Sequence, residues 1–324
     1  MTEKKFQLLK LNDYDIKDTI RGLALGNVKL AKNKKTNEFI SLHILNKSQI
    51  VKSNRIQHIS NELKILPTLE HPSIISFLGA NHDDKYVYLA FEFLQGGDLF
   101  NLLKLENKLS LDKAQFYAGQ IVFVIDYLHS KNIVYRALKP ENILINKNGY
   151  IKIIDFRLSK EIKDRTYTMC GTPGYLAPEI ILNKGYGLSV DWWAFGVLLY
   201  EMICGVDPFV DDDTMKIYEN ILQRKIQFTS DFDDSSRSLI KHLLEPELSK
   251  RYGNLKNGVK DIKNHPFFKG INWDKLIKQE VEAPFIPDIK DDNVLKYYTI
   301  SSETEDKDAE AFGKDNDPFK ELFN

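Results

Sequence analysis

Hydrophobic and polar positions alternate in the first third of the chain, which is the pattern of strands with one buried face. The alternation is clear over 27–32 and 39–45, and the polar residues between them have the composition of a turn. The run at 86–93 predicts a further strand. These segments together predict a small, sheet-rich unit.

Helical spacing first appears at 53–69, where the apolar residues share one face. Ser53 is the expected N-cap of this helix, and Pro67 is its expected end. A longer helix is predicted over 108–132, with Ser110 as its N-cap. The first unit is therefore expected to carry one helix beside its strands.

The second half of the chain is predicted to be mainly helical. It begins with a hairpin, because short strands at 142–145 and 150–155 flank an Asn-Gly turn. From about residue 175 onward helical spacing dominates. Gly96 and Gly97 interrupt the pattern upstream and mark a hinge between a small sheet-rich lobe and a larger helical lobe.

Composition narrows the classes of function. The 324 residues are 43% hydrophobic, enough for one large core or two lobes. A net charge of -1 gives no bulk attraction to nucleic acid or to an anionic membrane, and neither is expected as a partner. Two cysteines are too few for a disulfide framework. The acidic stretch 301–310 is expected to be mobile.

Targeting and membrane signals are also missing from the sequence. The longest apolar run, 192–205, is short for a membrane span and is better explained as a buried helix. The N-terminus lacks the apolar core of a signal peptide and the glycine needed for myristoylation. We expect a cytoplasmic protein, with the nucleus as an additional compartment.

Four ordered motifs carry a family resemblance: YRALKPENILI at 135–145, IIDF at 153–156, TMCGTPGYLAPE at 168–179 and VDWWAFGVLLYEM at 190–202. They resemble the catalytic loop, the metal-binding motif, the activation segment and the central helix of protein kinases. Segments 250–268, 281–287 and 319–323 are similar to the core end and the C-terminal tail of the AGC group. The chain most resembles the catalytic subunit of cAMP-dependent protein kinase.

This resemblance implies an α+β, two-lobed kinase fold. The N-lobe would be a small antiparallel sheet with one helix, the C-lobe would be mainly helical, and an AGC-type tail would return to the small lobe. The expected boundaries are an N-terminal extension at 1–13, the N-lobe at 14–92, the hinge at 93–97, the C-lobe at 98–269 and the tail at 270–324.

Two residues that kinases need are replaced. Ala137 stands where the family has the aspartate that acts as general base, and no neighbouring carboxylate takes its place. His43 stands where the family has the lysine that anchors the phosphates of ATP. Lys29 is not a substitute, because strand alternation points its side chain to the other face of the sheet.

The glycine-rich loop at 21–28 is also degraded. Only Gly26 fills a glycine position of the family, and a slipped alignment that uses Gly22 still lacks the middle glycine. Arg157 follows the metal-binding aspartate in place of glycine. We hypothesise that Arg157 pairs with Asp155 or with Glu62, and so partly replaces the metal or the missing lysine.

Other parts of a nucleotide site are retained. The resemblance assigns Lys139 to the γ-phosphate and Asn142 and Asp155 to Mg²⁺. It assigns a further set to the nucleotide pocket: Gly26, Val28, Glu62, Glu92 and Leu144. ATP with Mg²⁺ is therefore the implied cofactor, and its binding is expected to be weak.

The resemblance also implies a phosphorylation switch and a peptide site. Thr168 matches the activation-loop phosphosite, which an upstream kinase would fill, and its cationic partners are His58, Arg136 and Lys160. Asp98, Glu141 and Glu201 match carboxylates that bind arginines of the substrate. Gly174 replaces a further glutamate of the family.

Two hypotheses of function follow from these losses and retentions. The first is a pseudokinase that acts by binding a regulatory subunit, an active kinase or an arginine-rich peptide, as a monomer or a heteromer. The second is a divergent serine/threonine kinase with weak ATP-dependent phosphotransfer.

Overall fold

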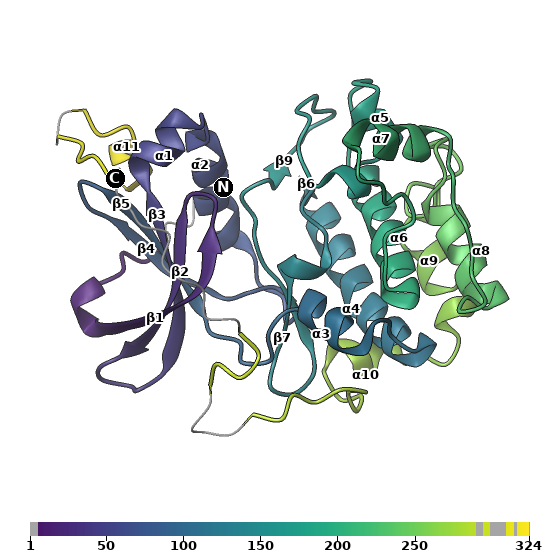
Figure 1. Cartoon of the computed structure of the whole chain (residues 1–324), viewed down its shortest axis with the longest axis horizontal. Coiled ribbons are helices and arrows are strands. Elements are labelled where there is room, and N and C mark those ends of the chain that lie inside the picture. Colours follow the sequence, from purple (N-terminus) through teal and green to yellow (C-terminus); the bar gives the residue numbers. More distant parts are fainter. Residues whose placement is uncertain (1–5, 290–293, 299–308, 314–315, 324) are drawn as a thin grey trace. The chain divides into compact units, whose positions relative to one another are not determined.

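The computed structural model describes residues 6–289, 294–298, 309–313 and 316–323 (Figure 1). Two compact units make up the chain. The first contains residues 1–70, 75–96 and 288–324, and the second contains 71–74 and 97–287. Residues 301–308 of the acidic stretch lie outside the described ranges.

The first unit is built on a five-stranded sheet with strand order β1-β2-β3-β5-β4, in which all neighbours are antiparallel. The three strands predicted from the alternation are β2, β3 and β5, and the antiparallel sheet is the one that the resemblance implied; β1 and β4 were not predicted individually. The bounds are β1 Tyr14–Leu23, β2 Gly26–Asn33, β3 Phe39–Asn46, β4 Phe77–His82 and β5 Tyr86–Glu92.

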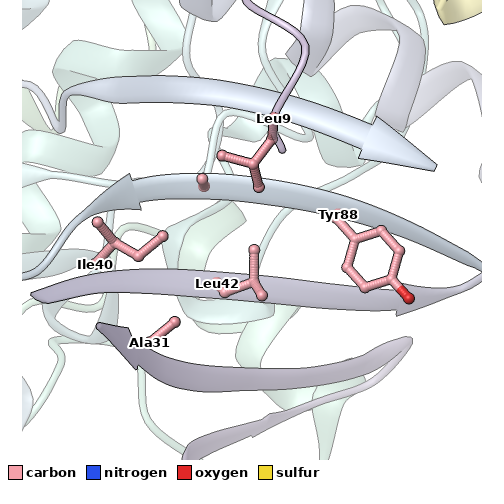
Figure 2. Packing of buried hydrophobic residues seen from close by; sticks show 6 residues of the cluster. Leu9, Ala31, Ile40, Leu42 and Tyr88 are labelled. Carbon is pink, nitrogen blue, oxygen red and sulfur yellow. The ribbon is translucent and has the colours of Figure 1, made fainter. Parts of the chain in front are cut away.

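Apolar side chains cover both faces of this sheet. One face carries a buried cluster in which Leu9 packs on Ile40, Leu42 and Tyr88 (Figure 2). The other face carries Val28 and Leu30, against which Leu295 of the C-terminal segment packs. Because alternate residues point to opposite faces, the register sets which side chains share a face.

Within its described residues, the first unit also contains α-helices, two of them between β3 and β4 and one near the C-terminus. They are α1 Lys47–Lys52, α2 Ile56–Ile65 and α11 Lys320–Phe323. The expected helix at 53–69 is α2, followed by a single 3-10 turn that contains Pro67. Ser53 as its N-cap was wrong, because the additional helix α1 ends there and Ser53 is the C-cap of α1.

The second unit is mainly helical, as predicted. Its helices are α3 Leu99–Glu106, α4 Leu111–Ser130, α5 Pro178–Ile181, α6 Ser189–Cys204, α7 Thr214–Leu222, α8 Asp234–Leu243, α9 Lys260–Lys263 and α10 Trp273–Ile277. Ser110 caps α4 by accepting a bond from the Lys113 amide, which confirms the expected N-cap. The apolar run at 192–205 falls largely in α6, whose side chains are nearly all buried. Among the described residues, no helix has the length and apolar character needed to cross a bilayer.

Short strand pairs complete the second unit. They are β7 Ile143–Ile145 with β8 Ile151–Ile153, and β6 Ile133–Val134 with β9 Lys160–Glu161. The β7–β8 pair is the predicted hairpin. Gly149 has φ +80°, and a side chain there would meet Phe285, so the turn needs glycine twice over.

A buried ion pair fixes the start of α5 to the segment after α8. The two guanidinium nitrogens of Arg251 donate to the two carboxylate oxygens of Glu179 at 2.6 and 2.9 Å. The Arg251 side chain is fully buried, and its remaining donors reach the carbonyls of Glu245 and Ser189. Every charge is therefore matched by fixed partners.

Candidate active site

The loop that precedes Ala137 has a fixed backbone. The carboxylate of Asp191, on α6, accepts bonds of 2.9 Å from the amides of Tyr135 and Arg136. His129 lies 2.9 Å from the same carboxylate. Arg136 has φ +64°, a conformation that these bonds hold in place. The loop therefore has a defined shape that does not depend on the side chain at 137.

Ala137 sits in this loop with a methyl group in place of a proton acceptor. The residue is 8% exposed, and its carbonyl accepts a 2.8 Å bond from the side-chain amide of Asn142. Asn142 is itself 3% exposed, so the loop closes around a buried amide. Hydrogen bonds hold the backbone of the loop, and the side chain of residue 137 has no group that could take a proton from an alcohol.

Arg157 neutralises the carboxylate that was assigned to the metal. Its Nε donates to Asp155 Oδ1 at 2.7 Å, and its Nη2 donates to Asp155 Oδ2 at 2.6 Å. The hypothesis that Arg157 pairs with Asp155 is confirmed. The backbone of Arg157 has no positive φ, so arginine fits here without strain.

This pair decides how well the residues suit Mg²⁺. A magnesium ion requires open carboxylate oxygens in octahedral geometry. Both oxygens of Asp155 accept from a guanidinium that carries its own positive charge. Among the described residues there is no group of three or more metal-ligating His, Cys, Asp or Glu. As arranged, Arg157 occupies both of the Asp155 oxygens that a magnesium ion would use.

The other predicted site residues of the second unit have partners within that unit. Lys139 reaches the carboxylate of Glu141 at 3.5 Å. Leu144 lies on β7 and is bridged to Asp98. Asp98 is the N-cap of α3, where its carboxylate accepts a 2.8 Å bond from the amide of Asn101. One of the three carboxylates predicted to bind peptide therefore also caps a helix.

His43 and Val28 are directly opposite each other in the β2–β3 pairing, so their side chains share one face of the sheet. The His43 ring packs against Phe91, with 4.7 Å between ring centroids. Lys29 falls on the opposite face, as strand alternation predicted. Position 43 is thus occupied by a ring within an aromatic contact rather than by a long cationic chain.

Gly26 and Glu92 have structural surroundings that explain them without a nucleotide. Gly26 has φ +148°, and a Cβ there would collide with the carbonyl oxygen of Ile44 on the neighbouring strand. Glu62 lies on α2 and is 2% exposed. Glu92 Oε1 accepts a 2.6 Å bond from the amide of Ser76. Their assignment to the nucleotide stays a prediction.

The predicted phosphate switch has an additional member that the sequence did not reveal. Arg136 donates to the Leu158 carbonyl at 2.7 Å and to the Tyr186 hydroxyl at 2.9 Å. The Tyr186 hydroxyl in turn donates to the Thr168 carbonyl at 2.5 Å. Lys160 donates to the Thr166 hydroxyl at 3.1 Å. Arg136, from the loop after β6, and Lys160 therefore contact the segment that carries Thr168, and the Thr168 residue itself is exposed. His58 belongs to the first unit, on α2.

In the second unit, the carboxylates of Asp207 and Glu141 lie close enough to Glu201 to affect its pKa. The pKa of Glu201 is raised to about 7, mainly by burial and also by the charges of Asp207 and Glu141, while the hydrogen bond that the Tyr175 hydroxyl donates to the carboxylate opposes this rise. Burial also raises the pKa of Asp207. A partner with a guanidinium group would relieve this repulsion.

Asp207 was not among the predicted residues. A Cβ placed on Gly174 would lie 3.3 Å from its carboxyl carbon, so Asp207 borders the space that the family's glutamate side chain would enter. The two positions are distant in the sequence, and a single aspartate after a helix carries no pattern that would have identified it. A carboxylate from another segment thus lies beside position 174.

We expect binding of an arginine-containing peptide to weaken as the pH is lowered through about 7, because Glu201 takes up a proton there. The loss should approach about tenfold per pH unit for one linked proton. Fluorescence anisotropy of a labelled peptide over a pH series measures it, with Glu201→Gln as the pH-independent control. A flat wild-type profile would contradict the expectation. Folding stability responds with the opposite sign: a raised pKa stabilises at low pH, and that contribution is lost as the pH rises through about 7.

A small antiparallel sheet with a helix, a larger helical unit, and a fixed loop between β6 and β7 together define a protein kinase fold. A family model described as protein kinase domain matches residues 21–268. The chain belongs to the protein kinase family.

Its relatives are named as cAMP-dependent kinases. The chain is 41% identical over 311 residues to the cAMP-dependent protein kinase catalytic subunit PRKX of Mus musculus, covering 96% of this chain and 88% of the relative. It is 43% identical over 280 residues to cAMP-dependent protein kinase type 3 of Saccharomyces cerevisiae, covering 86% and 70%. A catalytic subunit from Dictyostelium discoideum is 43% identical over 298 residues, covering 92% of this chain and 46% of the relative.

Proposed function

We propose that this chain is a pseudokinase, a kinase-fold protein that acts by binding other proteins rather than by transferring phosphate. The observation that carries the proposal is Ala137, a methyl group in a loop whose backbone is otherwise held by Asp191. The Arg157–Asp155 pair supports it, because the same side chain that would hold a metal is neutralised from within the chain.

Magnitudes separate weak activity from none. A general base contributes roughly 10²–10⁴ in rate. A positioned electrostatic group, such as the lysine that His43 replaces, contributes about 10²–10³. The combined loss is at most about 10⁴–10⁷, since such effects are not additive. From an ordinary kinase rate of about 1–100 per second, turnover would fall to about 10⁻²–10⁻⁷ per second, which is vestigial or negligible.

The binding role is proposed for basic partners. Glu141, Glu201 and Asp207 lie near one another in the second unit and suit a guanidinium, as in an arginine-rich peptide or the inhibitory segment of a regulatory subunit. An upstream kinase acting on Thr168 would add negative charge close to Arg136. The same proposal includes modulation of an active kinase that binds at these carboxylates.

A divergent kinase is the second candidate, and two observations favour it. The relatives are named as kinases, and Lys139 remains in the catalytic loop beside Glu141. Weak phosphotransfer with ATP would then occur without the usual base, by positioning alone.

Phosphotransfer to an arginine-rich peptide tests the proposal. We expect the purified wild-type chain to incorporate labelled phosphate from ATP no faster than Lys139→Ala, which removes the remaining loop cation. Both proteins need the same expression host, so that a contaminating kinase contributes equally. A wild-type rate that is clearly above background and is lost in Lys139→Ala would support the second candidate and reject the first.

A further inference from the structure

The segment Phe6–Lys10 runs beside β4 and extends the sheet. The amide of Leu9 donates to the carbonyl of Ala80 at 2.9 Å, and the amide of Ala80 donates to the carbonyl of Gln7 at 3.1 Å. The side chain of Asn81 adds a 2.7 Å bond to the Leu9 carbonyl. Leu9 is 5% exposed and covers the outer apolar cluster (Figure 2). This segment is therefore anchored by backbone bonds and by one buried side chain.

Gly79 makes this close approach feasible. It has φ +148°, and a Cβ there would collide with the carbonyl oxygen of Gln7. Any side chain at position 79 would push the N-terminal segment away from β4. A substitution at position 79 would therefore displace that segment specifically.

The other end of the chain docks on the same unit. Lys47 is fully buried, and its ammonium group donates to Asp317 at 2.5 Å and to the carbonyl of Asp83 at 2.6 Å. Phe319 is 0% exposed, as expected of a tail motif that returns to the small lobe. The Phe323 ring stacks on His82, with 4.5 Å between centroids.

Phe6 joins these two ends. Its ring meets Phe323 edge to face at 5.6 Å, and it meets Phe77 of β4 at 6.1 Å. Phe323 thus lies in ring contact with His82 from the sheet and with Phe6 from the N-terminal segment. Phe77 continues to Phe91 at 5.5 Å, and Phe91 contacts His43.

We infer that the N-terminal segment Phe6–Lys10 is a strap that holds the C-terminal segment Asp317–Phe323 in place, so that the two chain ends dock and release together. Segments at chain ends open at low free-energy cost unless they are tied down, and here each end supplies part of the other's contact surface. A protein that captures one end therefore frees the other and exposes Phe77 and Lys47. The inference is independent of whether the chain transfers phosphate.

Hydrogen exchange of the full-length protein tests the strap. Phe6→Ala should speed amide exchange over residues 316–323 by about two- to tenfold, the equivalent of one aromatic contact. Gly79→Ala should speed the same amides, although the mutated position does not contact the C-terminal segment. Leu8→Ala is the matched control, because Leu8 belongs to the same strap and its side chain is 55% exposed. It should leave the exchange unchanged.

The reciprocal variant and an internal reference complete the design. Phe323→Ala should speed exchange of the Leu9 amide, since coupling acts equally in both directions. Rates are expressed relative to amides of β5, which report general loss of stability and keep the comparison valid for a weakened variant. The strap is rejected if 316–323 exchanges at the wild-type relative rate in either Phe6→Ala or Gly79→Ala, or if Phe323→Ala leaves Leu9 unchanged.

Discussion

A variant that combines His43→Lys, Ala137→Asp and Arg157→Gly is expected to phosphorylate an arginine-rich peptide at least about 10⁴-fold faster than the wild type. The first change restores a cation on the Val28 face of the sheet, and the second restores a proton acceptor in a loop that already has its shape. The third releases both oxygens of Asp155 for a metal ion. Peptide phosphorylation is followed with labelled ATP and Mg²⁺.

The single reversions provide the contrast. Each one alone should stay within about tenfold of the wild type, because groups that act as a unit give little when only one is present. Lys139→Ala in the triple background should abolish the gain and serves as the control for contamination. A triple variant that is no faster than the wild type would mean that the decisive defect lies elsewhere, with the degraded loop at 21–28 as the next target.

Arg251→Ala is expected to lower the free energy of unfolding by about 3–5 kcal/mol. The substitution leaves the carboxylate of Glu179 buried without its bidentate partner, and it also leaves the carbonyl of Glu245 without its donor. Urea denaturation measured by fluorescence gives the free energy.

The neighbouring residue offers a matched control. Lys250 pairs with Glu247 at the surface, where both side chains are more than half exposed, and Lys250→Ala should leave stability unchanged within error. Replacing both Glu179 and Arg251 by leucine should recover part of the loss, because no uncompensated charge remains. A decrease below about 1 kcal/mol for Arg251→Ala would show that the pair contributes little more than a surface contact.

Local patterns predicted local structure well. Ser110 and the Asn-Gly turn at Gly149 were identified because capping and tight turns depend on a few adjacent residues. The prediction that Ser53 is an N-cap was wrong, because a different capping residue nearby starts a helix of its own. Asn46, at the end of β3, caps α1 by accepting a bond from the Gln49 amide, and this short helix uses the residues that would have preceded the expected N-cap.

The candidate site divides in a similar way. Motif spacing located Ala137, Asp155 and Arg157. The opposite charges of Asp155 and Arg157 were enough to suggest the ion pair that the structure contains. Tyr186 and Asp207 were missed because each acts on a segment far away in the sequence. No periodicity or charge pattern links such positions, and only the packing of the folded chain brings them together.

Gly26 is a glycine of the loop at 21–28 that the sheet itself requires. Its backbone passes so close to Ile44 that any side chain would break the β2–β3 pairing. Selection for a folded sheet alone is therefore enough to preserve this glycine, whatever the loop at 21–28 binds. A glycine at this position is therefore required by the sheet itself and does not by itself indicate that a nucleotide binds.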